Sequence, residues 1–180
     1  MRTIFADEAL TNQGWRENVS VTVEDGRIAS ATADASPAGA EERCAVLLPT
    51  VGNLHSHAFQ RAMAGMAERR GPNADTFWTW REVMYRHALT MTPAHVEATA
   101  LMLYVEMLEA GFGRVGEFHY LHHGPDGRPY ANIAEMAERI AAAAGDAGIR
   151  LTLLPVLYAH STFGGAAPTQ GQRRFINDIE

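Results

Sequence analysis

The chain has 180 residues, with 15 basic against 21 acidic side chains and a formal net charge of -6. This acidic balance argues against nucleic acid or an anionic membrane surface as a partner. All 15 basic residues are arginine, which excludes Schiff-base catalysis and a P-loop lysine. The single cysteine, Cys44, excludes an intrachain disulfide and a four-cysteine zinc site. Residues 1–20 lack the apolar run of a signal peptide, and no stretch approaches the ~18 apolar residues of a membrane span. The sequence thus predicts a soluble, cytoplasmic protein.

The first 48 residues are predicted to form a small antiparallel β module. Residues 3–6 favour a strand, and residues 18–23 alternate polar and apolar side chains, as a half-buried strand does. Asp25-Gly26 then favours a tight hairpin turn into a strand at residues 28–31. The Ala-, Ser-, Pro- and Gly-rich stretch that follows is predicted to be a loop.

From Cys44 onward the pattern changes to alternating strands and helices. The apolar run 45–48 favours a strand, followed by a turn at residues 51–53. A helix is predicted at 93–110, because Thr92 is a good N-cap, Pro93 suits the first turn and Gly111 can end it. This alternation indicates parallel βαβ units. The other expected elements are a helix opening at 76–82, a strand at 114–119, a helix at 133–147 and a well-buried strand at 150–157.

His55-Ser56-His57 follows the first apolar run closely. In an extended chain, residues i and i+2 point to the same face, so both imidazoles can reach one metal ion. A parallel barrel builds its active site at the carboxyl ends of its strands, where this pair would lie. The residues alone leave two interpretations open, a metal site or two solvated loop histidines.

A second histidine group, His119, His122 and His123, follows the strand at 114–119. Its spacing allows a zinc site, but no cysteine or carboxylate completes the ligand set, so packing at the strand end is the favoured interpretation. Tyr120, also at this strand end, is well placed to hold a polar substrate.

Arg81 lies in an aromatic segment with Phe77, Trp78 and Trp80, whose rings are expected to pack rather than bind a cofactor. Its guanidinium can form a surface salt bridge, the interpretation that the residues alone favour, or a fork for a substrate carboxylate. Gln60, three residues after His57, is either a helix-surface residue or a hydrogen-bonding group beside the metal. Cys44 is expected to be a small apolar residue rather than a nucleophile.

Together these segments resemble the formimidoylglutamate deiminases of the amidohydrolase superfamily. The segment from Pro49 to Ala62 resembles the first metal motif of that superfamily, and the extended form His-Ser-His-Ala-Phe-Gln-Arg at 55–61 is similar to the deiminases. The resemblance runs over essentially the whole chain. The other segments that carry it are 77–82, 117–123, 153–158 and 171–176.

The resemblance implies a mononuclear zinc enzyme of histidine degradation, which hydrolyses N-formimidoyl-L-glutamate to N-formyl-L-glutamate and ammonia. It implies that His55 and His57 are zinc ligands and that Gln60, Arg81 and Tyr120 hold this small-molecule substrate. The absence of lysine agrees with it, because binuclear members bridge their metals with a carboxylated lysine. No segment matches the family's remaining ligands, a His and an Asp, or its catalytic Glu and His, which are therefore expected beyond Glu180.

The expected fold is α/β, the amino-terminal part of a metal-dependent hydrolase TIM (β/α)8 barrel. A complete barrel needs roughly 200 to more than 400 residues, so we expect a shortened chain. Residues 1–48 would form the β module and 49–180 the first part of the barrel. Two alternatives stay open, another superfamily deaminase with an amidine or guanine-like substrate, and a non-catalytic fragment that binds zinc weakly or associates through its unfinished sheet. Association into a homo-oligomer such as a dimer is also left open.

Overall fold

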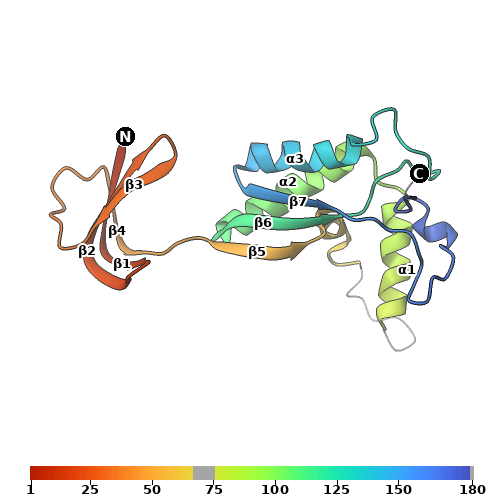
Figure 1. Cartoon of the computed structure of the whole chain (residues 1–180), viewed down its shortest axis with the longest axis horizontal. Helices are drawn as coiled ribbons and strands as arrows, with labels where there is room; N and C mark the ends of the chain where they lie inside the picture. Colours follow the sequence, from red (N-terminus) through yellow and green to blue (C-terminus); the bar gives the residue numbers. More distant parts are fainter. Residues whose placement is uncertain (67–75, 179–180) are drawn as a thin grey trace. The chain divides into compact units, whose positions relative to one another are not determined.

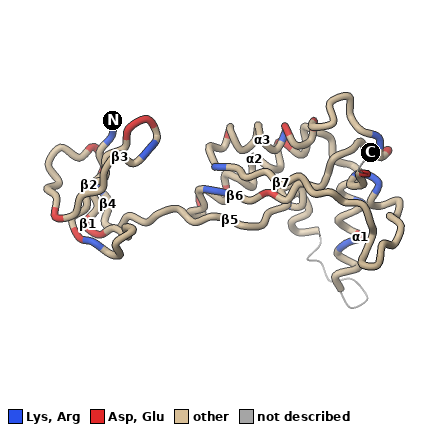
Figure 2. Tube along the Cα trace, viewed as in Figure 1, with Lys and Arg blue, Asp and Glu red and all other residues tan. Residues whose placement is uncertain are grey.

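The computed structural model describes residues 1–66 and 76–178. The chain divides into two compact units, Met1–Thr50 and Val51–Glu180, each with its own sheet. Among the described residues, no helix is long and apolar enough to cross a membrane. Along the trace in Figure 2, arginines and acidic residues are interspersed in both units, without a continuous basic stripe.

The first unit is a four-stranded sheet in the order β3-β2-β1-β4. β1 (Arg2–Thr11) pairs antiparallel with β2 (Gly14–Glu24), which pairs antiparallel with β3 (Arg27–Thr32). Asp25 and Gly26 connect β2 to β3 with φ angles of 48° and 72°. Two successive positive φ angles are typical of the turns that match the twist of a hairpin. The predicted hairpin is therefore confirmed.

The fourth strand, β4 (Glu42–Leu47), corrects two predictions about the end of this module. The apolar run 45–48 does not begin the alternating part of the chain, because β4 pairs parallel with β1 and completes a mixed sheet. The segment 51–53, predicted as a turn, begins β5 (Val51–Ser56) instead. Backbone pairing with the neighbouring strand β6 overrides the turn preference of Gly52 and Asn53, since a strand's register depends on its partners.

The second unit contains a three-stranded parallel sheet in the order β5-β6-β7. β6 spans Phe112–His119 and β7 spans Arg150–Pro155. Helix α2 (Pro93–Glu109) precedes β6, α3 (Glu135–Ala147) precedes β7, and both helices lie on the same face of the sheet (Figure 1). The predicted parallel βαβ arrangement is confirmed.

The helix boundaries follow the capping residues. Thr92 Oγ1 accepts a hydrogen bond from the backbone N–H of His95 at 3.2 Å, and Gly111 follows α2 with φ of 88°. Gly148 ends α3 with φ of 82°. Only glycine adopts this left-handed conformation without steric cost, so both helices stop where the sequence predicts. The remaining elements are η1 (Ala58–Met63), α1 (Phe77–Ala88), which Thr76 caps, and η2 (Gln170–Gln172).

Strand β7 is more exposed than the sequence predicts. Its leucines Leu151 and Leu153 are half-buried, and Leu154 is 37% exposed. Within the described part of the chain, no named strand pairs with its outer edge, so only β6 and α3 cover it. The strand that is buried is β6, where Val115, Glu117 and His119 are each at most 2% exposed.

Candidate metal and substrate site

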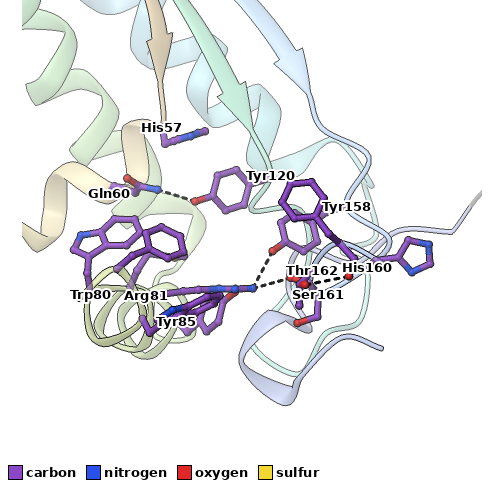
Figure 3. Close-up of a pocket in the computed structure, with 14 residues that line it drawn as sticks. His57, Gln60, Trp80, Arg81, Tyr85, Tyr120, Tyr158, His160, Ser161 and Thr162 are labelled. Atoms are coloured by element: carbon purple, nitrogen blue, oxygen red, sulfur yellow. Dashed lines mark hydrogen bonds between the residues drawn. The ribbon is translucent and has the colours of Figure 1, made fainter. Parts of the chain in front are cut away.

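A cavity of about 910 Å³ lies at the carboxyl ends of β5, β6 and β7. Parallel strands present their following residues at one common edge, which is where barrel enzymes place their active sites. Figure 3 shows these side chains converging from η1, α1 and the segments that follow the three strands. The lining residues are His57, Gln60, Phe77, Trp78, Trp80, Arg81, Met84, Tyr85, Tyr120, Tyr158, His160, Ser161, Thr162 and Phe163.

His55 and His57 turn the same ring nitrogen toward each other, with their Nε2 atoms 3.0 Å apart. His57 Nδ1 lies 2.7 Å from the carbonyl oxygen of Phe118, so Nδ1 carries the hydrogen and Nε2 keeps a free lone pair. Burial lowers the pKa of His57 below its usual value, with a smaller contribution from His55, and so favours the neutral ring. The His55 ring stacks on Phe118 at a centroid distance of 4.5 Å.

The two rings are suited to serve as two ligands of one zinc ion. Neutral imidazoles are zinc ligands, and a second-shell hydrogen bond such as that of His57 to Phe118 normally fixes a ligand ring. A cation held by both rings would lie where the two Nε2 atoms now face each other. No group of three His, Cys, Asp or Glu side chains suited to a metal exists within residues 1–66 and 76–178.

Glu117 on β6 lies beneath the histidine pair and is 1% exposed. Its Oε1 accepts a hydrogen bond from the backbone N–H of Ala58 at 2.6 Å, and Tyr104 donates to Oε2 at 3.4 Å. Burial raises the pKa of the Glu117 carboxyl, while its hydrogen bonds with Ala58, Ser56 and Tyr104 oppose the rise. The carboxylate thus holds the backbone immediately after His57 in place.

Gln60 and Tyr120 meet inside the cavity. Gln60 Nε2 donates a hydrogen bond to the Tyr120 hydroxyl oxygen at 2.7 Å, which joins η1 to the end of β6 (Figure 3). The Tyr120 ring contacts His57 edge-to-face at 4.9 Å. Burial raises the pKa of Tyr120 well above its usual value, so the phenol is a neutral donor.

Arg81 reaches the cavity from α1. Its Nη2 donates to the carbonyl oxygen of Ser161 at 3.0 Å, and its Nε donates to the hydroxyl of Tyr85. The guanidinium also lies 5.5 Å from the ring of Trp78. No acidic side chain of the described residues forms a salt bridge with Arg81, which disfavours the surface ion-pair interpretation.

The end of α1 is held by Arg174, a buried cation with 0% exposure. Its guanidinium donates to the carbonyl oxygens of His123 at 2.7 Å and Met91 at 2.8 Å, and to that of Ala88. A buried charge needs such polar partners to offset its desolvation. Arg174 therefore anchors the helix that carries Arg81 to the loop after β6.

The second histidine group has a different arrangement. The Nε2 atoms of His122 and His123 lie 3.0 Å and 2.8 Å from the carbonyl oxygens of Val156 and Ile176, so those nitrogens carry hydrogen. His119 is buried, and burial together with His122 lowers its pKa to about 3. These rings pack and bind backbone, in agreement with the interpretation favoured from the sequence.

The structure thus brings four of the five predicted residues, His57, Gln60, Arg81 and Tyr120, into one cavity wall, with His55 beside His57. Sequence reasoning missed Glu117, Tyr85 and Tyr158. Tyr85 lies one helical turn after Arg81, and Tyr158 follows the end of β7, so both positions carried a signal that was not used.

The fold and the position of the site indicate the class of protein to which this chain is similar. Over 99% of its length, the chain superimposes on a crystal structure described as an amidohydrolase from Brucella melitensis, with a TM-score of 0.94 and 62% identity. It also superimposes on the atrazine chlorohydrolase TrzN from Arthrobacter aurescens complexed with zinc, with a TM-score of 0.63 and 20% identity, over 85% of this chain and 35% of that one. The fold is the amino-terminal part of an amidohydrolase-superfamily TIM barrel preceded by a β module.

Sequence relatives define the branch of this superfamily. Residues 1–45 match the family described as "Formimidoylglutamate deiminase HutF, N-terminal domain". The whole chain is 54% identical to the formimidoylglutamate deiminase of Pseudomonas aeruginosa. By sequence, the chain is similar to the amino-terminal part of the formimidoylglutamate deiminases. It spans 40% of the length of the Pseudomonas protein and of the Brucella structure.

Proposed function

We propose that the barrel to which this sequence contributes hydrolyses N-formimidoyl-L-glutamate to N-formyl-L-glutamate and ammonia, with one zinc ion as cofactor. The single observation that carries the proposal is the cavity in which His57, Gln60, Tyr120 and Arg81 converge, in a chain 54% identical to a formimidoylglutamate deiminase. The proposal concerns the complete barrel, because the described residues supply two metal ligands and catalytic zinc usually has three.

His55 and His57 would hold the zinc ion through their Nε2 atoms, which already face each other at 3.0 Å. The zinc complex of the Arthrobacter relative supports the choice of metal. A zinc ion in such a site acts as a Lewis acid toward water or substrate. Within this chain, the Phe118 carbonyl holds the His57 ring, the Phe118 ring stacks on His55, and the Glu117 carboxylate holds the backbone of Ala58.

Arg81 would bind one carboxylate of the substrate, since it is the only charged side chain besides histidine among the residues that line the described cavity. Gln60 and Tyr120 would hold the formimino end closer to His57, because Tyr120 contacts that ring and Gln60 binds the Tyr120 hydroxyl. Trp78, Trp80 and Met84 add apolar surface to the cavity, and Met84 is buried while Trp78 is exposed.

In the proposed reaction, the oxygen of water bonds to the formimino carbon, and the bond from this carbon to its terminal nitrogen breaks. That nitrogen takes up a proton and leaves as ammonia, which requires a general acid. A cytoplasmic location and a dimeric state stay predictions from the sequence.

The test is ammonia release from N-formimidoyl-L-glutamate by the full-length product of the gene that carries this sequence. Arg81→Ala should raise KM by about 100-fold, the upper range for hydrogen bonds to a charged group. A wild-type protein that releases no ammonia from this substrate would refute the proposal. Deamination of guanine, a neutral ring, with Arg81→Ala as active as wild type would favour the alternative superfamily deaminase.

A further inference from the structure

Arg81, Tyr85 and Tyr158 lie together at one end of the cavity (Figure 3). Arg81 and Tyr85 lie one turn apart on α1, and Tyr158 follows β7 (Figure 3). All three line the cavity. None of the other lining residues is acidic, so the guanidinium charge has no carboxylate partner in this wall.

A buried amide behind this wall fixes the direction of one hydroxyl group. Gln172 is 0% exposed, and its Oε1 accepts a hydrogen bond from the backbone N–H of Thr169 at 2.8 Å. Because Oε1 is thereby assigned, the other end of the amide is the donor, and Nε2 donates to the Tyr158 hydroxyl oxygen at 2.9 Å. Tyr158 is thus an acceptor toward Gln172, and its own hydrogen points elsewhere.

The Tyr85 hydroxyl is constrained in the same way. Arg81 Nε donates to the Tyr85 oxygen, so this oxygen is also an acceptor and its hydrogen is available. Arg81 Nη2 also donates to the Tyr158 hydroxyl oxygen at 3.5 Å, so the same guanidinium contacts both phenols. Both phenol oxygens thus accept hydrogen bonds, and both phenols line the cavity, where each can offer its own hydrogen as a donor.

The guanidinium offers a further free donor at the same place. Nε and Nη2 of Arg81 bind Tyr85 and the Ser161 carbonyl, whereas Nη1 has no hydrogen-bond partner among the described residues. A cation and a hydroxyl donor side by side are suited to an anion with two oxygen atoms, such as a carboxylate.

We infer that Tyr85 and Tyr158 complete, with Arg81, the site for one substrate carboxylate, and that Gln172 is a positioning residue that keeps the Tyr158 hydroxyl turned as a donor. This inference rests on the proposed function, because it assigns part of the substrate to a wall of the same cavity. It adds that a phenol, and not the guanidinium alone, distinguishes a carboxylate-bearing amidine from a plain one.

The test compares N-formimidoyl-L-glutamate with N-propylformamidine, an amidine without carboxylates, on the full-length gene product. Tyr158→Phe should raise KM for the first substrate by about 10- to 100-fold, the range for one hydrogen bond to a charged group, and change kcat less than about 3-fold. The ratio of kcat/KM values between the two substrates should fall by at least about 10-fold.

Gln172→Glu tests the orientation, because it keeps the shape of the side chain and still offers an oxygen to Thr169. The new carboxylate accepts the Tyr158 hydrogen and turns it away from the cavity. The substrate ratio should fall as in Tyr158→Phe, and the double variant should lose little more than either single one. If Gln172 had only a structural role, Gln172→Glu would lower kcat/KM for both substrates equally.

Tyr130→Phe is the matched control, because its hydroxyl accepts from Arg174 at 3.3 Å and it does not line the cavity. It should retain the wild-type substrate ratio. A wild-type protein inactive on formimidoylglutamate overturns the proposed function. An active wild type whose ratio is unchanged in Tyr158→Phe overturns the inference alone and leaves the proposed function standing.

Discussion

Two histidine groups lie at the carboxyl ends of neighbouring strands and differ in what their ring nitrogens contact. At the end of β5, His57 binds a carbonyl through Nδ1, so its Nε2 faces that of His55. After β6, His122 and His123 bind carbonyls through Nε2, the nitrogen that would otherwise be free to bind a metal. The position of one backbone carbonyl thus distinguishes the ring that we propose as a metal ligand from a ring that binds only backbone.

The first prediction tests whether the first histidine group binds zinc. His57→Ala should weaken zinc binding by more than about 100-fold, because loss of a ligand exceeds the 10- to 100-fold effect of losing an outer-shell partner. Equilibrium dialysis of the full-length gene product against a competing chelator measures the affinity.

The matched control is His122→Ala, which removes a ring bound to the Val156 carbonyl. It should cost about 1 kcal/mol of folding free energy, the value of one hydrogen bond, and leave zinc affinity within a few-fold. Equal zinc loss in both variants would contradict the separation of the two groups.

The second prediction concerns the support beneath the first group. Glu117→Gln keeps the shape of the side chain but removes the charge that accepts the Ala58 N–H at 2.6 Å. Zinc affinity should fall about 10-fold, the lower range for an outer-shell partner. The control is Glu106→Gln on α2, whose carboxylate pairs with Arg61 at 2.6 Å outside the cavity. If both variants bind zinc equally well, Glu117 has no special role in the metal site.

The third prediction concerns the second group and pH. The folded protein holds the pKa of His119 at about 3, below the usual 6.5, because the ring is buried and faces His122. Between these values the unfolded chain binds the extra proton, so stability is complete above pH ~6.5 and falls as pH drops toward 3. Between these two pKa values, this group changes the free energy of unfolding by about 1.4 kcal/mol per pH unit.

His119→Phe should remove this pH dependence of the free energy of unfolding, because phenylalanine does not titrate. The substitution breaks no hydrogen bond of Nε2, which is buried and has no partner. Chemical unfolding of the metal-free protein at pH 7, 6 and 5 measures it. A variant with the wild-type slope would show that another group, such as His122, carries the acid sensitivity.

The sequence by itself determined the elements whose signals are local. The caps at Thr92 and Gly111 set the bounds of α2, and the turn at Asp25-Gly26 set the first hairpin. Positions at strand ends indicated His55, His57 and Tyr120, because residues that follow parallel strands share one edge, whereas Gln60 and Arg81 were indicated by the resemblance. Such signals need only the neighbouring residues or the order of the elements.

Only the tertiary structure decided features that depend on partners distant in sequence. It assigned β4 to the first sheet, because β1 pairs with it, and it left β7 half-exposed at the sheet edge. It also joined Glu117 to Ala58 and Gln172 to Tyr158, hydrogen bonds across 59 and 14 residues. No periodicity encodes these contacts, since a buried hydrogen bond is set by which surfaces pack together. The sequence therefore identified the residues that reach the cavity, and the packing around them decided what each one can bind.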